Sequence, residues 1–329
     1  MRVLSEGDAV FNPIRMVRPE NRRDSGFALI IVIWGIGVIS VLALAFVAAA
    51  RERVQSSVNI VRAIQSDALA DGAIALALAS VARFAQASES TPRYTGEPLY
   101  CSMPEGSLAA IAIEDEGGKV DINAATQPLL ALLLQGVGLE RSRAGTLARN
   151  IAIFRSAANR QTQMDDEAYR AAGLLYGPKH ALFQTSLELD QVIGFDARLF
   201  RLLLPLVTTY AGRPGINPET APPALFAALS GIEPAVVVSL IEHPWPNQID
   251  RNHQKFPLAF LASGASGVLM VHVDVLSPGG QSSVRERLVD VQSPAVEKYL
   301  IKETRRGVPR FLDTLRALGG QGAGALPQC

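Results

Sequence analysis

The chain has 329 residues, which is enough for one or two domains with a sizeable hydrophobic core. Its 31 lysines and arginines balance 31 aspartates and glutamates, so the charge gives no indication of a nucleic acid or an acidic substrate as partner. Aromatic residues make up only 6% while alanine and leucine abound, which favours helices over an all-β fold.

The N-terminal part combines a basic leader with an apolar run. Residues 1–26 contain prolines and scattered charge without hydrophobic periodicity, and they end on Gly26. Residues 27–50 contain no charged side chain, and a helix of this length, at ~1.5 Å per residue, crosses a hydrocarbon core of ~30 Å. The basic residues nearest the run are Arg15, Arg18, Arg22 and Arg23.

These flanks predict a single-pass protein of a bacterial inner membrane. By the positive-inside rule the leader faces the cytoplasm and the residues after Ala50 face the periplasm, although Arg51 and Arg53 reduce the asymmetry. A cleaved secretory signal is the alternative, but its apolar region spans roughly 7–15 residues. The run here is longer and its helical pattern continues, so we expect a membrane anchor.

The helical pattern extends beyond the predicted membrane segment. Val54, Val58 and Val61 recur at three- and four-residue steps, and no proline follows Phe27 until Pro92. Residues 27–88 therefore predict one helix of ~90 Å, apolar all round in its first half and amphipathic in its second. This helix is either an anchor with a stalk or a spine that packs against other helices.

The remaining sequence predicts an α+β fold in which a helical domain is inserted into a small antiparallel sheet. Residues 267–276 and 284–291 flank a Ser-Pro-Gly-Gly turn and are typical of an antiparallel strand pair. The Gly- and Ala-rich end from Gly319 is expected to be disordered. In chain order we predict a leader (1–26), a transmembrane and spine helix (27–88), a loop with the first sheet strands (89–122), an inserted α-helical domain (123–265), the remaining strands (266–303) and a tail (304–329).

The predicted helical domain contains a weak internal repeat. Residues 120–134 and 215–229 share Ile-Asn, then Thr, Pro and a leucine- and alanine-rich helix. Asn123 and Asn217 stand where each helix needs an N-cap residue. Two copies are too few for a solenoid, so the repeat predicts two helical subdomains of similar design.

The sequence offers little for catalysis, so we expect a protein that is not an enzyme. There is no G-x-S-x-G, P-loop or G-x-G-x-x-G motif, and the four histidines show no metal-ligand spacing. His272 lies in a predicted strand and is expected to be an ordinary core or surface residue. An anchored hydrolase would require a convergent nucleophile–base pair, for which the sequence gives no candidate.

Acidic residues and cysteines leave two questions open. Residues 114–116 and 165–167 could offer oxygen ligands to calcium, but neither has EF-hand spacing, and a solvated surface is the simpler interpretation. Cys101 and Cys329 could pair in an exported protein, whereas a cysteine at the chain end is often an unpaired thiol.

Residues 186–204 resemble a helix-hairpin-helix, a nucleic-acid-binding shape. Its turn has only Gly194, and Asp190 and Asp196 oppose contact with a phosphate. We therefore expect a packing module and no nucleic acid partner. The alternative function is a signal-anchored periplasmic DNA-binding protein of DNA uptake.

The junction of Gly26 and Phe27 resembles the leader of prepilin-type proteins. This resemblance implies that prepilin peptidase cleaves between the two residues and methylates the new N-terminus at Phe27. Major pilins place a glutamate at the fifth mature position, which is thought to meet the N-terminal amine of the preceding subunit; here the residue is Ile31. A subunit without this glutamate needs no predecessor, so it can take the first place at the tip of a fibre.

Together with the inserted domain, Ile31 makes the chain resemble the K-type minor pseudopilin (GspK-like) of the type II secretion system. The similarity includes residues 115–126, 186–210 and 215–221 and the strand pair after 267. It implies a pseudopilin fold and a place at the pseudopilus tip, where the protein nucleates or caps assembly for export of folded proteins across the outer membrane.

The same resemblance implies partners and a cofactor. The partners are the I- and J-type minor pseudopilins, the major pseudopilin, prepilin peptidase and the inner-membrane assembly platform. Val54, Val58 and Val61 would contact partner helices above the bilayer. No cofactor is required, and calcium, which some relatives bind, is left without assigned ligands, because residues 151–160 lack the acidic, tryptophan-containing run of those relatives.

Overall fold

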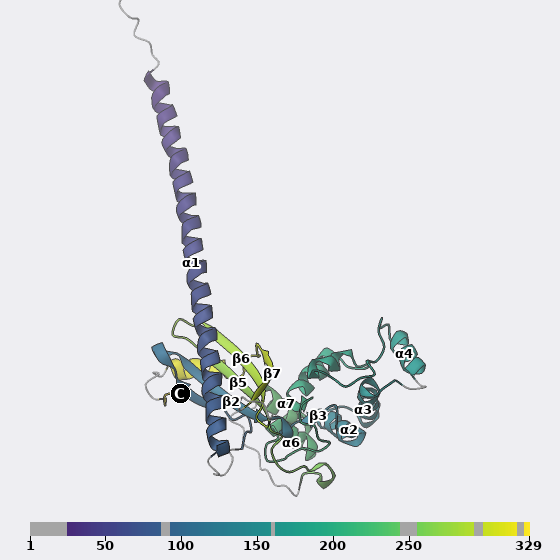
Figure 1. Ribbon diagram of the computed structural model, residues 1–329. Coiled ribbons are helices and arrows are strands. Elements are labelled where there is room, and N and C mark those ends of the chain that lie inside the picture. Colours follow the sequence, from purple (N-terminus) through teal and green to yellow (C-terminus); the bar gives the residue numbers. More distant parts are fainter. Residues whose placement is uncertain (1–24, 87–92, 159–161, 244–254, 293–298, 321–325) are drawn as a thin grey trace, which may run out of the picture. The chain divides into compact units, whose positions relative to one another are not determined.

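The computed structural model describes residues 25–86, 93–158, 162–243, 255–292, 299–320 and 326–329. The chain forms two compact units, residues 1–61 and 62–329, and each is described here by itself (Figure 1). Helix α1, Ser25–Gln86, begins in the first unit and ends in the second. The leader predicted at residues 1–26 lies almost wholly outside the described residues.

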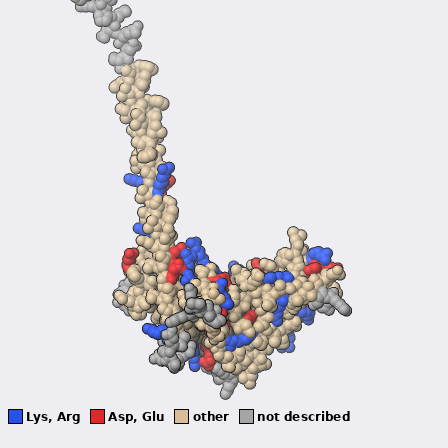
Figure 2. All heavy atoms as spheres, viewed as in Figure 1, with Lys and Arg blue, Asp and Glu red and all other residues tan. Residues whose placement is uncertain are grey.

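The first unit is an apolar helix whose side chains are open to its surroundings. Trp34 is 73% exposed and Phe46 is 75% exposed. Among the described residues, α1 alone is long and apolar enough to cross a membrane, with a mean hydropathy of 2.8 over its most apolar window. Figure 2 shows no charged atoms along the first part of this helix. Such a surface requires lipid or other helices to cover it.

The second unit is built on a five-stranded antiparallel sheet with the order β1-β2-β5-β6-β7. β5 and β6 form the predicted hairpin, and β7 extends it at the edge. β2 and β5 pair directly although the whole helical domain lies between them in sequence. The strands are β1 Leu99–Ser102, β2 Leu108–Asp115, β5 Val268–Leu276, β6 Ser282–Asp290 and β7 Leu300–Arg305.

Both faces of the sheet are covered, which explains why β5 is apolar along most of its length. On one face, Ala70, Ala73 and Ile74 of α1 pack against valines of β5 and β6, and the small alanines let the helix lie close to the strands. On the other face, helix α8, Leu312–Gly320, packs Leu315 against Ala110. A strand buried on both faces loses the polar alternation of a half-exposed strand.

The inserted domain has a separate core of leucine, alanine and phenylalanine side chains. A short parallel pair, β3 Val120–Asp121 and β4 Val207–Thr208, lies at its base. Its helices are α2 Gln127–Gly136, α3 Arg141–Arg155, α4 Thr162–Ala171, α5 Ala197–Leu203, α6 Pro223–Leu229 and α7 Pro234–Glu242.

Two helical hairpins, α2–α3 and α6–α7, follow the two repeated segments. Each turn contains a glycine with positive φ, Gly138 at 99° and Gly231 at 74°, and each second helix begins after a glutamate. Helix α2 meets α6 at Gly136, where a Cβ atom would lie 2.5 Å from the carbonyl oxygen of Ala228. The two repeated segments therefore each contribute to a helical hairpin, and the two hairpins pack against each other.

The predicted capping role of the two asparagines is wrong. Thr126 caps α2 by accepting from the Leu129 N–H, and Pro222 precedes α6. Asn123 instead exchanges two hydrogen bonds with the backbone of Phe183, because its turn ends three residues before the helix begins.

The structure also bears on the helix-hairpin-helix resemblance, which was set aside in favour of a packing module, and on the predicted disorder of the chain end. Residues 186–204 are no helix-hairpin-helix, because Ser186–Gln191 is a 3-10 turn and α5 is the single α-helix of the segment. The end of the chain is not disordered at Leu326–Cys329, which lies beside β1. Residues 321–325 lie outside the described part.

Candidate assembly interface

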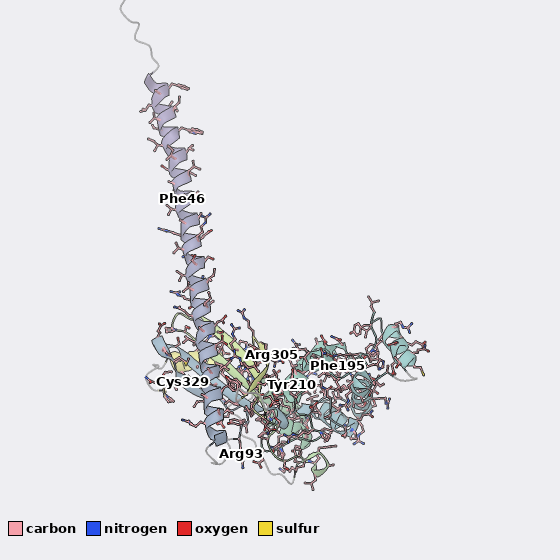
Figure 3. All side chains as sticks on the ribbon, viewed as in Figure 1. Phe46, Arg93, Phe195, Tyr210, Arg305 and Cys329 are labelled. Atoms are coloured by element: carbon pink, nitrogen blue, oxygen red, sulfur yellow. A yellow bond between two sulfur atoms is a disulfide. The ribbon has the colours of Figure 1, made fainter. Side chains whose placement is uncertain are left out.

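The predicted processing and assembly residues lie on the exposed part of α1. Phe27 is 70% exposed, and Ile31 follows it one turn later on the same face. The described helix carries no acid before Glu52. Gly26 lies in the first turn of α1. Figure 3 shows Phe46 further along this apolar helix.

Val54, Val58 and Val61 form a second exposed stripe on α1. Their exposed fractions are 63%, 40% and 54%, and their spacing of four and three residues places them on one helix face. The structure therefore places these three residues on one face of α1. Which partner contacts them is taken up below.

Polar side chains that the sequence analysis missed fix α1 to the sheet. The buried Ser66 hydroxyl lies 2.9 Å from that of Ser277. Asp67 pairs with Arg285 at 2.6 Å, and Asp71 pairs with Arg287 at 3.1 Å. The spacing of these residues is the sequence signal that could have indicated the two pairs. Asp67 and Asp71 are four residues apart on a helix, and Arg285 and Arg287 are two apart on a strand; both spacings place side chains about 6–7 Å apart on one face.

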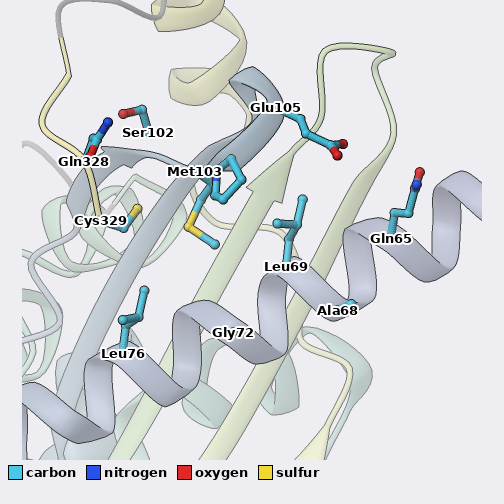
Figure 4. Close-up of a pocket in the computed structure, with 11 residues that line it drawn as sticks. Gln65, Ala68, Leu69, Gly72, Leu76, Ser102, Met103, Glu105, Gln328 and Cys329 are labelled. Carbon is cyan, nitrogen blue, oxygen red and sulfur yellow. The ribbon is translucent and has the colours of Figure 1, made fainter.

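An apolar groove of about 760 Å³ lies between α1 and the end of β1 (Figure 4). Small residues, Ala68 and Gly72, form its floor on the helix. Met103 and Cys329 line it from the sheet side. Cys329 is joined to Cys101 by a disulfide, which answers the question that the sequence left open.

On the sheet face opposite α1, a set of ionisable side chains forms what we call the buried charge network; five are buried, whereas Glu114, Arg305 and Arg310 are partly exposed. Its members are Glu114, Glu116, Lys119, His272, Asp274, Glu286, Arg305 and Arg310.

His272 is the centre of one half of this network. Its Nε2 atom lies 2.7 Å from Asp274 and its Nδ1 atom 2.9 Å from Glu286, so each ring nitrogen has a carboxylate partner. Glu286 also accepts from Arg305 at 2.6 Å and from Arg310 at 3.2 Å. Burial would raise the pKa of Glu286, but the hydrogen bond from His272 and the charge of Arg310 hold it well below its usual range. His272 is therefore a buried network residue rather than an ordinary strand residue.

Glu114 is the centre of the other half. It pairs with Arg310 and, at 2.7 Å, with Lys119, which also binds Glu116 at 2.8 Å. Burial would raise the pKa of Glu114, but Arg310 and Lys119 lower it to about 2. The network thus connects β2, β5 and β6 to β7 and to the residues that lead into α8.

The Glu114 pKa predicts a loss of stability in acid. A depressed folded-state pKa means that the unfolded chain binds the proton more tightly, so the stabilisation is complete above the ordinary pKa of 4.5 and disappears as the pH falls towards about 2. The change from this one group is at most about 3 kcal/mol. Urea midpoints measured between pH 6 and 2 should show it.

Glu114→Gln should reduce the fall in unfolding free energy between pH 4.5 and 2. Asp313→Asn should leave this fall unchanged, because Asp313 is 97% exposed in its pair with Arg316. Parallel pH profiles for the wild type and Glu114→Gln would contradict the assignment.

The acidic triplets do not form a calcium site among the described residues. The Lys119 ammonium group already pairs with the carboxylates of Glu114 and Glu116. The Asp115 carboxylate accepts hydrogen bonds from the backbone N–H groups of Gly117 and Ser266. No group of three or more His, Cys, Asp or Glu in the described ranges could hold a metal ion. Residues 165–167 lie along α4.

The segments that carried the family resemblance meet at the junction of the sheet and the inserted domain. The backbone N–H of Asn217 donates to Gly117 at 2.9 Å, and the buried Asp121 carboxylate accepts from Gly212 at 2.6 Å. Burial raises the pKa of Asp121, and the backbone N–H groups of Gly212, Asn123 and Ala124, which donate to this carboxylate, oppose that rise. At Gly118 a Cβ atom would lie 2.4 Å from the carbonyl oxygen of Thr220. Glycine and short polar residues therefore permit this close approach.

The helical hairpins do not present a free phosphate site. At the start of α3, the Glu140 carboxylate accepts from the N–H groups of Ser142 and Arg143, at 2.9 and 3.3 Å. A carboxylate thus occupies the place where a phosphate would bind a helix N-terminus. At the start of α7, Pro234 removes a backbone donor. This geometry gives no support to the DNA-binding alternative.

Comparison with known proteins agrees with this architecture. Residues 108–212 match the family described as Type II secretion system (T2SS), protein K. None of the curated protein sequences matches the chain significantly. The fold is similar to a chain of the crystal structure of the GspK–GspI–GspJ complex from the enterotoxigenic Escherichia coli Type 2 secretion system. That chain is 18% identical with a TM-score of 0.54, and the match covers 78% of this chain and 100% of that one.

A long N-terminal apolar helix, a small antiparallel sheet and an inserted helical domain define a protein with the pseudopilin fold, so the predicted α+β class is confirmed. Within this class, the matched family and the fold together confirm the resemblance to the K-type minor pseudopilin of type II secretion. This family is structural rather than catalytic, and the apolar α1 segment is consistent with its membrane anchor.

Proposed function

We propose that the protein occupies the tip of the type II secretion pseudopilus, where it nucleates or caps assembly for export of folded proteins across the outer membrane. The observation that carries this proposal is Ile31 on an exposed helix that has no acid before Glu52. A pilin glutamate in this place would be costly in lipid unless it met the amine of a preceding subunit. A subunit with isoleucine has no such requirement and can therefore come first.

The proposed partners follow from the exposed surfaces of α1. Lipid would cover residues 27–50 before assembly, and the helices of the I- and J-type minor pseudopilins and the major pseudopilin would cover the stripe of Val54, Val58 and Val61 afterwards. Prepilin peptidase and the assembly platform would act at the inner membrane. A disulfide between Cys101 and Cys329 supports a location of the second unit in the oxidising periplasm, with the N-terminus in the cytoplasm.

Processing at Gly26 gives the first test. Gly26→Ala should leave an uncleaved precursor that fails to support secretion, because the peptidase is expected to need glycine before the scissile bond. The N-terminal sequence of the purified membrane form should begin at Phe27 in the wild type and at the precursor start in the variant.

Gly35→Ala is the matched control, because nothing lies within 4 Å of a Cβ atom there and processing should be normal. A mature-sized Gly26→Ala protein would refute the cleavage site. The tip position has its own test: label on the inserted domain should mark one end of isolated pseudopili, and label along their length would contradict it.

A further inference from the structure

The C-terminal segment, Leu326–Cys329, closes the outer edge of the sheet. The Ser102 N–H donates to the Pro327 carbonyl at 2.8 Å, and the Cys329 N–H donates to the Ser102 carbonyl at 3.0 Å. Gln328 thereby forms a single parallel β-bridge with Ser102, the last residue of β1. An uncovered edge would offer these backbone groups to another strand.

The disulfide that holds this segment is reachable from one side only. Cys101 is 1% exposed within the core between α1 and the sheet, whereas Cys329 is exposed. Cys329 also lines the groove between α1 and β1, and Gln328 forms part of the same wall (Figure 4). An attacking thiolate needs access to one sulfur, and of the two cysteines Cys329 is the exposed residue that lines the groove.

We propose that the Cys101–Cys329 disulfide is a thiol-exchange site, opened at Cys329 by a dithiol reductant, and that opening it uncovers the β1 edge. A thiolate of the reductant attacks Cys329 Sγ, the bond to Cys101 breaks, and Cys101 leaves as a thiolate that takes up a proton. The second thiol then resolves the mixed disulfide. The protein gains two electrons and two protons, and the dithiol becomes a disulfide.

Opening the disulfide changes a defined part of the surface. Within the part of the chain that the structure describes, the C-terminal segment then keeps the hydrogen bonds at Ser102 and the packing of Leu326 against the α8 cluster. When the C-terminal segment dissociates from β1, the groove loses Gln328 and Cys329 from its lining. Oxidation state therefore controls both the β1 edge and the shape of the groove beside α1.

The first test identifies the sulfur that is attacked. Full-length protein in detergent micelles is incubated with reduced glutathione, quenched, alkylated and mapped by mass spectrometry. Glutathione is expected on Cys329, with the alkyl label on Cys101. Glutathione first on Cys101, or on neither cysteine while the disulfide stays intact, would overturn the proposal.

The second test follows the sheet edge by hydrogen exchange at short labelling times. With dithiothreitol, or in Cys329→Ser without it, the Ser102 amide, followed in peptide 99–103, should exchange at least about tenfold faster, while α3 stays protected. Gln328→Ala keeps the disulfide and should retain wild-type exchange. Unchanged exchange at 99–103 would contradict edge opening. So would an equal rise in α3, since the disulfide would then hold the whole fold rather than one edge.

Discussion

The Glu286→Ala variant is expected to lose about 3–5 kcal/mol of unfolding free energy, because breaking a buried ion pair leaves the partner charges without compensation. Three side chains depend on this carboxylate: His272, Arg305 and Arg310. Arg310 and Phe311 also donate their backbone N–H groups to Asp274, so the loss should spread to the start of α8. Urea unfolding of the full-length protein in detergent, followed by circular dichroism, measures the effect.

Glu286→Gln is the informative companion, because it keeps the volume and part of the hydrogen bonding and should fall between the wild type and Glu286→Ala. Asp313→Ala removes an exposed pair on α8 and should change stability by less than about 0.5 kcal/mol. If Glu286→Ala were as mild as Asp313→Ala, the buried charge network would not stabilise the sheet.

The Gly118→Ala variant should cost about 3 kcal/mol, near the upper end for overpacking. The added Cβ atom would meet the carbonyl oxygen of Thr220 at 2.4 Å and the nitrogen of Ala221 at 2.8 Å. Both are backbone atoms, so no side-chain rotation can relieve the contact. The junction must open instead, which should also loosen the hydrogen bond from Asn217 to Gly117. The urea midpoint and the amide exchange of Asn217 report the two effects.

Gly145→Ala provides the matched control in the same domain. Gly145 lies within α3 with nothing near its potential Cβ atom, so alanine should stabilise the helix by about 0.5–1 kcal/mol. If Gly118→Ala lowers the free energy of unfolding while Gly145→Ala raises it, the contact with Thr220 explains the effect at Gly118. Equal destabilisation would show that loss of glycine itself, rather than the contact with Thr220, determines the result.

The sequence predicted those parts of the fold that repeat a local pattern. The uncharged run from Phe27 and the valines at 54, 58 and 61 predicted α1, and alternating β-branched residues predicted β5 and β6. The pseudopilin fold followed from the family resemblance rather than from periodicity. The separate leader could not be compared, since it lies outside the described residues.

Features that depend on distant contacts could not be predicted in this way. Asn123 was expected to cap a helix, but its partner is Phe183, sixty residues away in sequence. His272 and Glu286 are neighbours only because β5 and β6 pair, and Arg310 joins them from beyond β7. The glycine-rich end suggested disorder because composition carries no information about a disulfide 228 residues away along the chain.

The two crossings between sheet and helical domain lie at one end of one strand pair. β2 ends at Asp115 and β5 begins at Val268, and Asp115 is paired with Leu269 in the same ladder. The entire helical domain therefore occupies the position of a single hairpin loop. A change in the length of such an insertion would leave the pairing of β2 with β5 intact, because both of its ends lie at the same end of this strand pair.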